Sequence, residues 1–138
     1  MIMRWSISFP SNSRYVSDIE SDSAPEYIAT RRILDDLGVR LPNLRDCITV
    51  GRVCEAVSRR SATLAGAAAA SLLNQMGRKQ VTVGVDGSVY RFHPTFAYIV
   101  EETMKKSLND GISFKMRLST DGSGRGAALV AAAAVQGQ

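Results

Sequence analysis

The chain has 138 residues, with 17 basic and 13 acidic side chains and a formal net charge of +4. This length suits one small domain or part of a larger one, and the mild basic charge, scattered in pairs without aromatic side chains between them, argues against nucleic-acid binding. No stretch approaches the roughly 20 apolar residues that span a bilayer, and the start lacks the apolar centre of a signal peptide. We therefore expect a protein of the cytoplasm without a membrane span.

The cysteines and the histidine limit redox and metal chemistry. Cys47 and Cys54 lie on one predicted helix, about 10 Å apart along its axis at 1.5 Å per residue. That separation is too large for a disulfide, so both are predicted to be free, mostly buried thiols. With His93 as the single histidine, we expect no metal site.

The first predicted helix follows an irregular start. Ser13–Ser17 is predicted to be a loop or a short extended piece. Ser23 and Glu26 have capping-box spacing with Pro25 in the first turn, so a helix should begin there and stop at Gly38. Its buried stripe should consist of Tyr27, Thr30, Leu34 and Leu37.

A long helix is predicted in the middle of the chain. Pro42-Asn43 breaks the chain, and apolar residues at helical spacing then run from about Asp46 to Met76, with Gly77 past the end. The predicted core stripe is Val50, Val53, Cys54, Val57, Leu64, Ala68 and Leu72. The small residues between Ala62 and Ala70 should let a neighbouring element approach closely.

Two β-branched segments, Val81–Val85 and Ser88–Arg91, flank Asp86-Gly87. This pattern is typical of a β-hairpin, although Asp86-Gly87-Ser88 could instead place a carboxylate near a ligand. A further helix should open at His93-Pro94, and its buried stripe should be Phe96, Ile99, Val100, Met104 and Leu108. We interpret His93 as a structural or solvent-facing residue, because no nucleophile or second ligand is evident near it.

The strictest apolar alternation in the chain, at Ile112–Leu118, predicts a strand. It leads into a glycine-rich segment, Gly122–Gly126, and then into an alanine-rich helix from about Gly124 to Val135. Glycines let a backbone approach a ligand closely, the free N–H groups of a helix start attract anions, and hydroxyls come from Ser119, Thr120 and Ser123. The segment lacks the Walker lysine and the dinucleotide spacing, so it fits either a nucleotide cradle or a plain strand–helix connection.

The predicted elements give an α/β class with few strands. Three strands fall short of the usual five or so, so the chain looks like the end of a domain whose first strands lie elsewhere, and it should expose apolar surface. Ser13 and Ser17 around Arg14 could hold phosphate or ribose oxygens or form a surface loop. Ser58 and Ser61 have no predicted base beside them, so a serine nucleophile is not expected.

Four segments, taken in order, closely resemble the C-terminal part of hexokinases, glucokinase included. They are Tyr15–Asp22, Val53–Ala62, Val83–Tyr90 with His93-Pro94, and Asp121–Ala128. The resemblance runs from about Arg14 to about Val135, so residues 1–12 are set apart as a non-matching segment and residues 13–138 as the matching portion. It implies an incomplete ribonuclease-H-like α/β domain of the actin and sugar-kinase superfamily, namely the C-terminal, nucleotide-side portion of the hexokinase large domain.

The resemblance also implies which residues bind ATP. In the family, the loops that match Ser13–Ser17 and Ser119–Ser123 contact the nucleotide. Phosphate or ribose oxygens would be held by Ser13, Arg14 and Ser17, with Tyr15 and Val16 in the same loop. The adenosine end would be lined by Ser119, Asp121, Gly122 and Ser123, with Thr120 in the same loop and with Gly124 and Gly126 opening the helix beneath it.

The implied activity is the ATP-dependent phosphorylation of a hexose such as glucose at its 6-hydroxyl, the first step of glycolysis, with ATP and magnesium. The family's two phosphate loops, its hexose ligands and its catalytic aspartate do not occur in this sequence, so no catalytic residue and no metal ligand is assigned. We expect the chain alone to lack hexokinase activity. Two alternatives stay open: a non-catalytic nucleotide-binding or regulatory module derived from a hexokinase, and a small α/β module whose glycine segment binds another anion.

Overall fold

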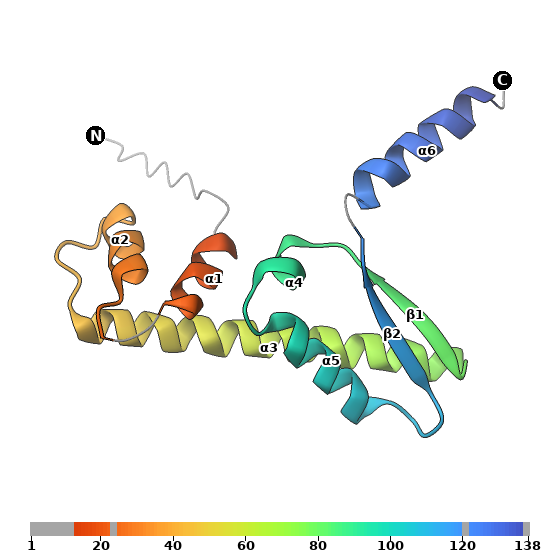
Figure 1. The fold of residues 1–138 in the computed structure, drawn as a ribbon, viewed down its shortest axis with the longest axis horizontal. Coiled ribbons are helices and arrows are strands. Elements are labelled where there is room, and N and C mark those ends of the chain that lie inside the picture. The colour runs from red at the N-terminus through yellow and green to blue at the C-terminus, as the bar shows by residue number, and fades with distance from the viewer. Residues whose placement is uncertain (1–12, 23–24, 120–121, 137–138) are drawn as a thin grey trace, which may run out of the picture. The chain divides into compact units, whose positions relative to one another are not determined.

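The computed structural model describes residues 13–22, 25–119 and 122–136 (Figure 1). The chain forms two compact units, Met1–Arg60 and Ser61–Gln138. Along the sequence, the boundary between them falls within the long helix α3 (Leu44–Met76). The N-terminal unit contains α1, α2 and the first part of α3, and the C-terminal unit contains all later elements.

Helix α1 (Ser13–Ser21) occupies the segment for which a loop or extended piece was expected at Ser13–Ser17, so that prediction is wrong. The segment is polar at both ends, which suggested a loop. Its apolar residues nevertheless recur at helical spacing, and Ile19 is buried. Tertiary burial of one side of a short, polar helix therefore outweighs its weak local preference.

Helix α2 (Ile28–Asp36) begins later than the predicted start, and Ser23 of the expected capping box lies outside the described residues. The start is stabilised from a distance by Asp22, whose Oδ2 accepts hydrogen bonds from the backbone N–H of Thr30 (2.7 Å) and from its Oγ1 (2.8 Å). The predicted stop at Gly38 is confirmed, since this glycine has a φ of 87°. The buried stripe is Thr30, Ile33 and Leu34, and Leu37 is exposed.

Helix α3 starts at Leu44 and ends at Met76, close to the predicted bounds. Asn43 and Asp46 form a reciprocal cap, in which each backbone N–H donates to the other side chain at 2.9 and 3.1 Å. The predicted core stripe is wrong, because Val53, Val57, Leu64 and Leu72 are more than half exposed. The buried face instead carries mostly small residues, namely Cys47, Ser58, Ala62, Gly66 and Ala70, together with Leu73.

The small face of α3 allows a close approach by α5 (Phe96–Ser107) in the C-terminal unit. A Cβ added at Gly66 would lie 2.7 Å from the backbone oxygen of Val100 and 2.8 Å from Cβ of Thr103. The prediction that small residues here permit close packing is therefore confirmed. The core of this unit contains a cluster of four buried apolar residues, Ala62, Leu73, Val100 and Met104.

The predicted hairpin around Asp86-Gly87 is wrong. β1 (Gln80–Val85) pairs in parallel with β2 (Ser113–Leu118), in a register from Gln80 opposite Ser113 to Val85 opposite Leu118. Two parallel strands need a crossover, which α4 (Ser88–Phe92) and α5 provide. Ser88–Arg91 is thus helical, and one face of the sheet packs on the core through Val81, Val83, Phe114 and Met116.

The final helix α6 (Gly122–Gln136) follows β2, as predicted for the alanine-rich segment. Its Leu129 and Val130 are both 71 % exposed. With the exposed valines and leucines of α3, they agree with the expectation that this chain presents apolar surface. Within the described residues, the helices are too short or too polar to cross a membrane.

Candidate functional site

The loops that follow β1 and β2 lie at one edge of the sheet. Because the strands are parallel, their carboxyl ends share that edge, and open parallel sheets bind ligands just outside it. The backbone N–H of Ser119 donates to the oxygen of Val85 at 2.8 Å, which continues the strand pairing into the loops. The structure therefore brings Asp86-Gly87-Ser88 beside the segment that begins at Ser119.

The predicted adenosine segment is partly described. Ser119 is exposed at the end of β2, and Thr120 and Asp121 lie outside the described residues. Gly122 and Ser123 begin α6, and Gly124 and Gly126 follow in its first turns, with open space around Gly126. The alanine-rich helix after β2 is confirmed, but it begins at Gly122 and not near Gly124, so the glycines lie in its first turns rather than in a separate loop. The first N–H groups of α6 have no partner within the helix.

The predicted phosphate segment, Ser13–Ser17, lies in the N-terminal unit on α1. The exposed Arg14 side chain pairs with Asp18 one turn later, at 3.7 Å, and Tyr15, Val16 and Ser17 are half-buried. A shallow groove beside α1 and α2 is lined by Arg14 and Arg32 and also by Asp18, Asp22 and Asp36. Aspartates outnumber arginines there, so an anion at Arg14 would compete with the carboxylate of Asp18.

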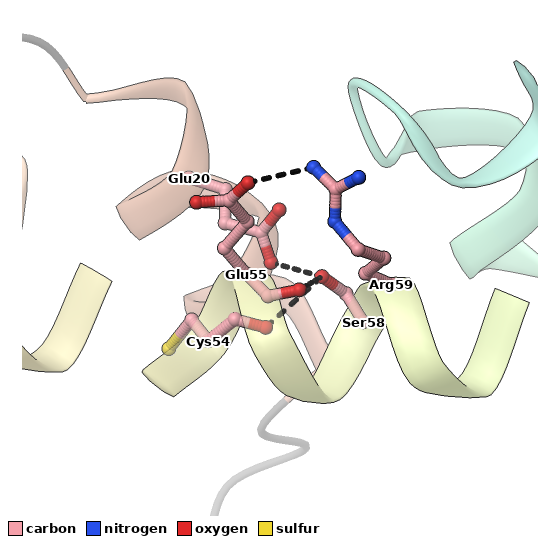
Figure 2. Close-up of polar contacts among 5 residues, drawn as sticks. All are labelled: Glu20, Cys54, Glu55, Ser58 and Arg59. Atoms are coloured by element: carbon pink, nitrogen blue, oxygen red, sulfur yellow. Dashed lines mark hydrogen bonds and ion pairs between the residues drawn. The ribbon is translucent and has the colours of Figure 1, made fainter. Parts of the chain in front are cut away.

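A buried hydroxyl links α1 to α3 in the N-terminal unit (Figure 2). Ser58 is 6 % exposed, and its Oγ donates to Oε1 of Glu20. The backbone oxygen of Cys54 also lies within reach of this hydroxyl, at 2.9 Å. Arg59, the next residue along α3, forms an ion pair with Glu55 at 2.8 Å. The acceptor of Ser58 could not be predicted from the sequence, because Glu20 lies on another helix.

This cluster has the properties of a structural contact rather than of a nucleophile. Ser58 is enclosed, so a substrate carbon could not reach its oxygen. Burial, and then the negative charge of Glu20, raise the pKa of the Cys54 thiol above its usual value. Cys54 therefore stays protonated near neutral pH and is a poor nucleophile.

A second polar contact lies behind the loop after β1. Tyr90 of α4 donates its hydroxyl hydrogen to Oε1 of Glu101 on α5 at 2.8 Å. Burial, and then the hydrogen bond and charge of Glu101, raise the pKa of Tyr90 to about 12, so the phenol remains a donor at all physiological pH values. The sequence did not point to either residue as part of a site, because Tyr90 was predicted to lie on a strand and its partner lies on another element.

The remaining candidate, His93, is buried. Its Nδ1 accepts a hydrogen bond from the backbone N–H of Thr95 at 3.3 Å, and its ring meets the ring of Phe96 edge-on at 6.0 Å. These contacts agree with a structural role. Among the residues that the structure describes, no group of three or more histidine, cysteine, aspartate or glutamate side chains is placed to hold a metal ion.

Comparison with known proteins gives a consistent result. The sequence profile of a family described as "Hexokinase" matches residues 3–133, which includes part of the segment 1–12 that was set apart above. The chain is 42 % identical over 125 residues to a hexokinase of Brugia malayi, which covers 91 % of this chain and 22 % of that protein. It is 44 % identical over 121 residues to a hexokinase of Schistosoma mansoni, covering 87 % of this chain and 27 % of that protein.

A solved structure, a hexokinase from Schistosoma mansoni complexed with glucose, superposes with a TM-score of 0.78 at 43 % identity. The match covers 88 % of this chain and 28 % of that one, so the chain spans about a quarter of the length of these relatives. Its α/β architecture, with a small parallel sheet, is a partial domain of the actin and sugar-kinase fold. By sequence and by fold, the chain belongs to the hexokinase family.

Proposed function

We propose that this chain supplies part of the ATP site of a hexokinase, which transfers the γ-phosphoryl group of MgATP to the 6-hydroxyl of a hexose. The observation that carries the proposal is the shared carboxyl edge of β1 and β2, where a glycine-rich segment opens α6. In parallel sheets this edge is the usual place for a ligand, and free N–H groups at a helix start attract phosphate oxygens.

The proposed roles follow from this edge and from the family. Ser119, Thr120, Asp121, Gly122 and Ser123 would line the adenosine end, and Gly124 and Gly126 would let the nucleotide approach the first turns of α6. Asp86-Gly87-Ser88 joins this set because it lies beside Ser119. On α1, Ser13, Arg14 and Ser17, with Tyr15 and Val16 between them, would hold phosphate or ribose oxygens.

The phosphoryl transfer itself would depend on residues that this chain does not show. Such transfer relies on positioning and on stabilisation of charge, and bound magnesium would neutralise the phosphate oxygens. The described residues offer hydroxyls, backbone N–H groups and an arginine, but no carboxylate cluster for the metal. Glucose is the proposed sugar because the solved Schistosoma mansoni relative is a glucose complex.

A non-catalytic nucleotide-binding module is the second candidate. It is favoured because no group of side chains among the described residues is placed to hold a metal ion. The two candidates differ in one measurement. Because this chain alone is expected to bind MgATP without hexose-dependent ADP release in both cases, the measurement needs a longer protein that carries this segment together with the family's phosphate loops and hexose ligands. ADP release by that protein at a normal enzyme rate would support the kinase, whereas MgATP binding without release would support the module.

The test of the ATP site is a titration calorimetry series on the full chain. We expect wild-type protein to bind MgATP, and Gly124→Val to weaken the affinity by about tenfold or more, equivalent to about 1.4 kcal/mol. Gly51→Val is the matched control, because Gly51 also lies in a helix and has open space around it. Absence of MgATP binding by wild-type protein, or equal affinities of all three proteins, would contradict the proposed site.

A further inference from the structure

The short helix α4 connects the loop after β1 to the core of the C-terminal unit. It has five residues, and no side chain caps its first residue. Helices of this length are not stable alone in water, so its position must depend on contacts with other elements. Its orientation determines where Asp86-Gly87-Ser88 lies, because α4 follows this loop without a spacer.

Tyr90 makes the contact that fixes α4. Its ring packs against the apolar cluster, and its hydroxyl donates to Glu101 on α5 at 2.8 Å. Glu101 lies between two residues that anchor α5 in the core, since Val100 is 5 % exposed and Met104 is fully buried. The acceptor, Glu101, is therefore carried by the well-packed helix α5. The donor, Tyr90, is carried by the short helix α4, which needs contacts with other elements.

We propose that Tyr90 and Glu101 are positioning residues, which hold the loop Asp86-Gly87-Ser88 at the carboxyl edge of the β1–β2 sheet for the phosphates of a bound nucleotide. The inference rests on the proposed ATP site. It goes further by assigning to one hydrogen bond a role in the placement of this loop. The pair does not contact the nucleotide, and it acts only through the position of α4.

Packing of the Tyr90 ring alone could also place the loop, and substitutions separate the two explanations. Tyr90→Phe keeps the ring and removes the donor. Glu101→Met removes the acceptor at similar size, whereas Glu101→Gln keeps an oxygen that can accept. Tyr98→Phe is the matched control, because Tyr98 lies on α5, is 70 % exposed and has no hydrogen bond among the described residues.

Hydrogen exchange of the full chain, followed by mass spectrometry, is the direct test. We expect Tyr90→Phe and Glu101→Met to speed amide exchange in residues 87–92 about fivefold, the effect of one partly exposed hydrogen bond. Exchange in residues 99–105 should stay unchanged. Glu101→Gln should keep most of the protection that Glu101→Met loses, because its amide oxygen can still accept the hydrogen bond. If packing of the Tyr90 ring alone placed the loop, the two variants would behave alike. Equal exchange in Tyr90→Phe and Tyr98→Phe, or equal effects of Glu101→Gln and Glu101→Met, would overturn the proposal.

Calorimetry with MgATP separates this inference from the proposed function. If wild-type protein binds MgATP, Tyr90→Phe should weaken the affinity several-fold and Glu101→Gln should weaken it less. Binding that is the same in wild type, Tyr90→Phe and Glu101→Met would overturn the positioning role and leave the ATP site in place. If wild-type protein does not bind MgATP, the ATP site fails, and the exchange measurement still decides whether the pair holds the loop.

Discussion

Different kinds of contact stabilise the N-terminal unit and the C-terminal unit of this chain, each within itself. In the C-terminal unit, an apolar cluster that includes the fully buried Met104 joins α3, α5 and the sheet. In the N-terminal unit, directed hydrogen bonds connect the helices, from Ser58 to Glu20 and from Thr30 to Asp22. The stability of the N-terminal unit should therefore depend mainly on its polar partners. The stability of the C-terminal unit should depend mainly on side-chain volume.

Arg31 provides two more directed hydrogen bonds in the N-terminal unit. Arg31 donates from Nε to the backbone oxygen of Glu26 at 3.0 Å and from an Nη atom to that of Pro42 at 2.8 Å. It thereby fixes both connections that flank α2. Such bonds need specific atoms but little volume, whereas dispersion packing in the other unit depends on the fit of whole side chains.

The largest effect is expected where α3 and α5 approach most closely. Gly66→Val would place its Cβ 2.7 Å from the backbone oxygen of Val100, which cannot move without displacing α5. We expect a loss of roughly 3 kcal/mol in the free energy of unfolding of the C-terminal unit. Hydrogen exchange should show lost protection in α5, while α2 in the other unit keeps its protection.

Gly51→Val provides the control for this substitution, since Gly51 lies on the same helix and has open space around it. It should change the free energy of unfolding by well under 1 kcal/mol, because valine has a slightly higher helix propensity than glycine and its side chain meets no neighbour there. Equal losses for the two variants would mean that close packing of α3 on α5 does not limit the stability of this unit.

A smaller effect is expected in the N-terminal unit. Ser58→Ala removes the hydroxyl that donates to the half-buried carboxylate of Glu20. Loss of a buried hydrogen bond to a charged group should cost about 1–3 kcal/mol, seen as faster amide exchange in α1 with α5 unchanged. A double-mutant cycle with Glu20→Met, which removes the acceptor at similar size, isolates this pair, and a coupling energy near zero would show that the contact does not hold α1.

The contrast between the units also explains which parts of the fold could be predicted. The bounds of α3 depend on local signals, namely the cap at Asn43 and the glycine after Met76, and both are readable from sequence. Which face of α3 is buried depends instead on the neighbour that approaches at Gly66. Large apolar residues suggested the opposite face, because hydrophobic spacing identifies a helix but does not identify its partner.

Non-local pairing accounts for the other errors. Asp86-Gly87 between β-branched segments favours a hairpin, yet β1 pairs with a strand that follows after α4 and α5. For the candidate site, the succession of β2 and α6 could be predicted because strand, glycines and helix are consecutive, although the glycines lie inside α6 and not before it. The contacts of Ser58 with Glu20 and of Tyr90 with Glu101 join different helices, so they leave no pattern in a short window of sequence.

The smallest predicted effect is a pH dependence in the C-terminal unit. The pKa of Tyr90 is raised from 10.0 to about 12, so the folded unit holds this proton more tightly than the unfolded chain. The stabilisation is fully present below pH 10 and is lost as the pH rises through about 12. Because the phenol is partly exposed, we expect about 1 kcal/mol or less.

Urea unfolding of wild type and Tyr90→Phe, followed by circular dichroism between pH 8 and about 12, measures this effect. The two proteins differ only in the hydroxyl group of residue 90, so the difference in the free energy of unfolding isolates Tyr90. Wild type should be the more stable protein at pH 8, and its advantage should shrink steadily above pH 10. An advantage that stays constant over this range would mean that the hydroxyl of Tyr90 does not bond to Glu101 in solution, and Tyr90 would then hold α4 through the apolar packing of its ring.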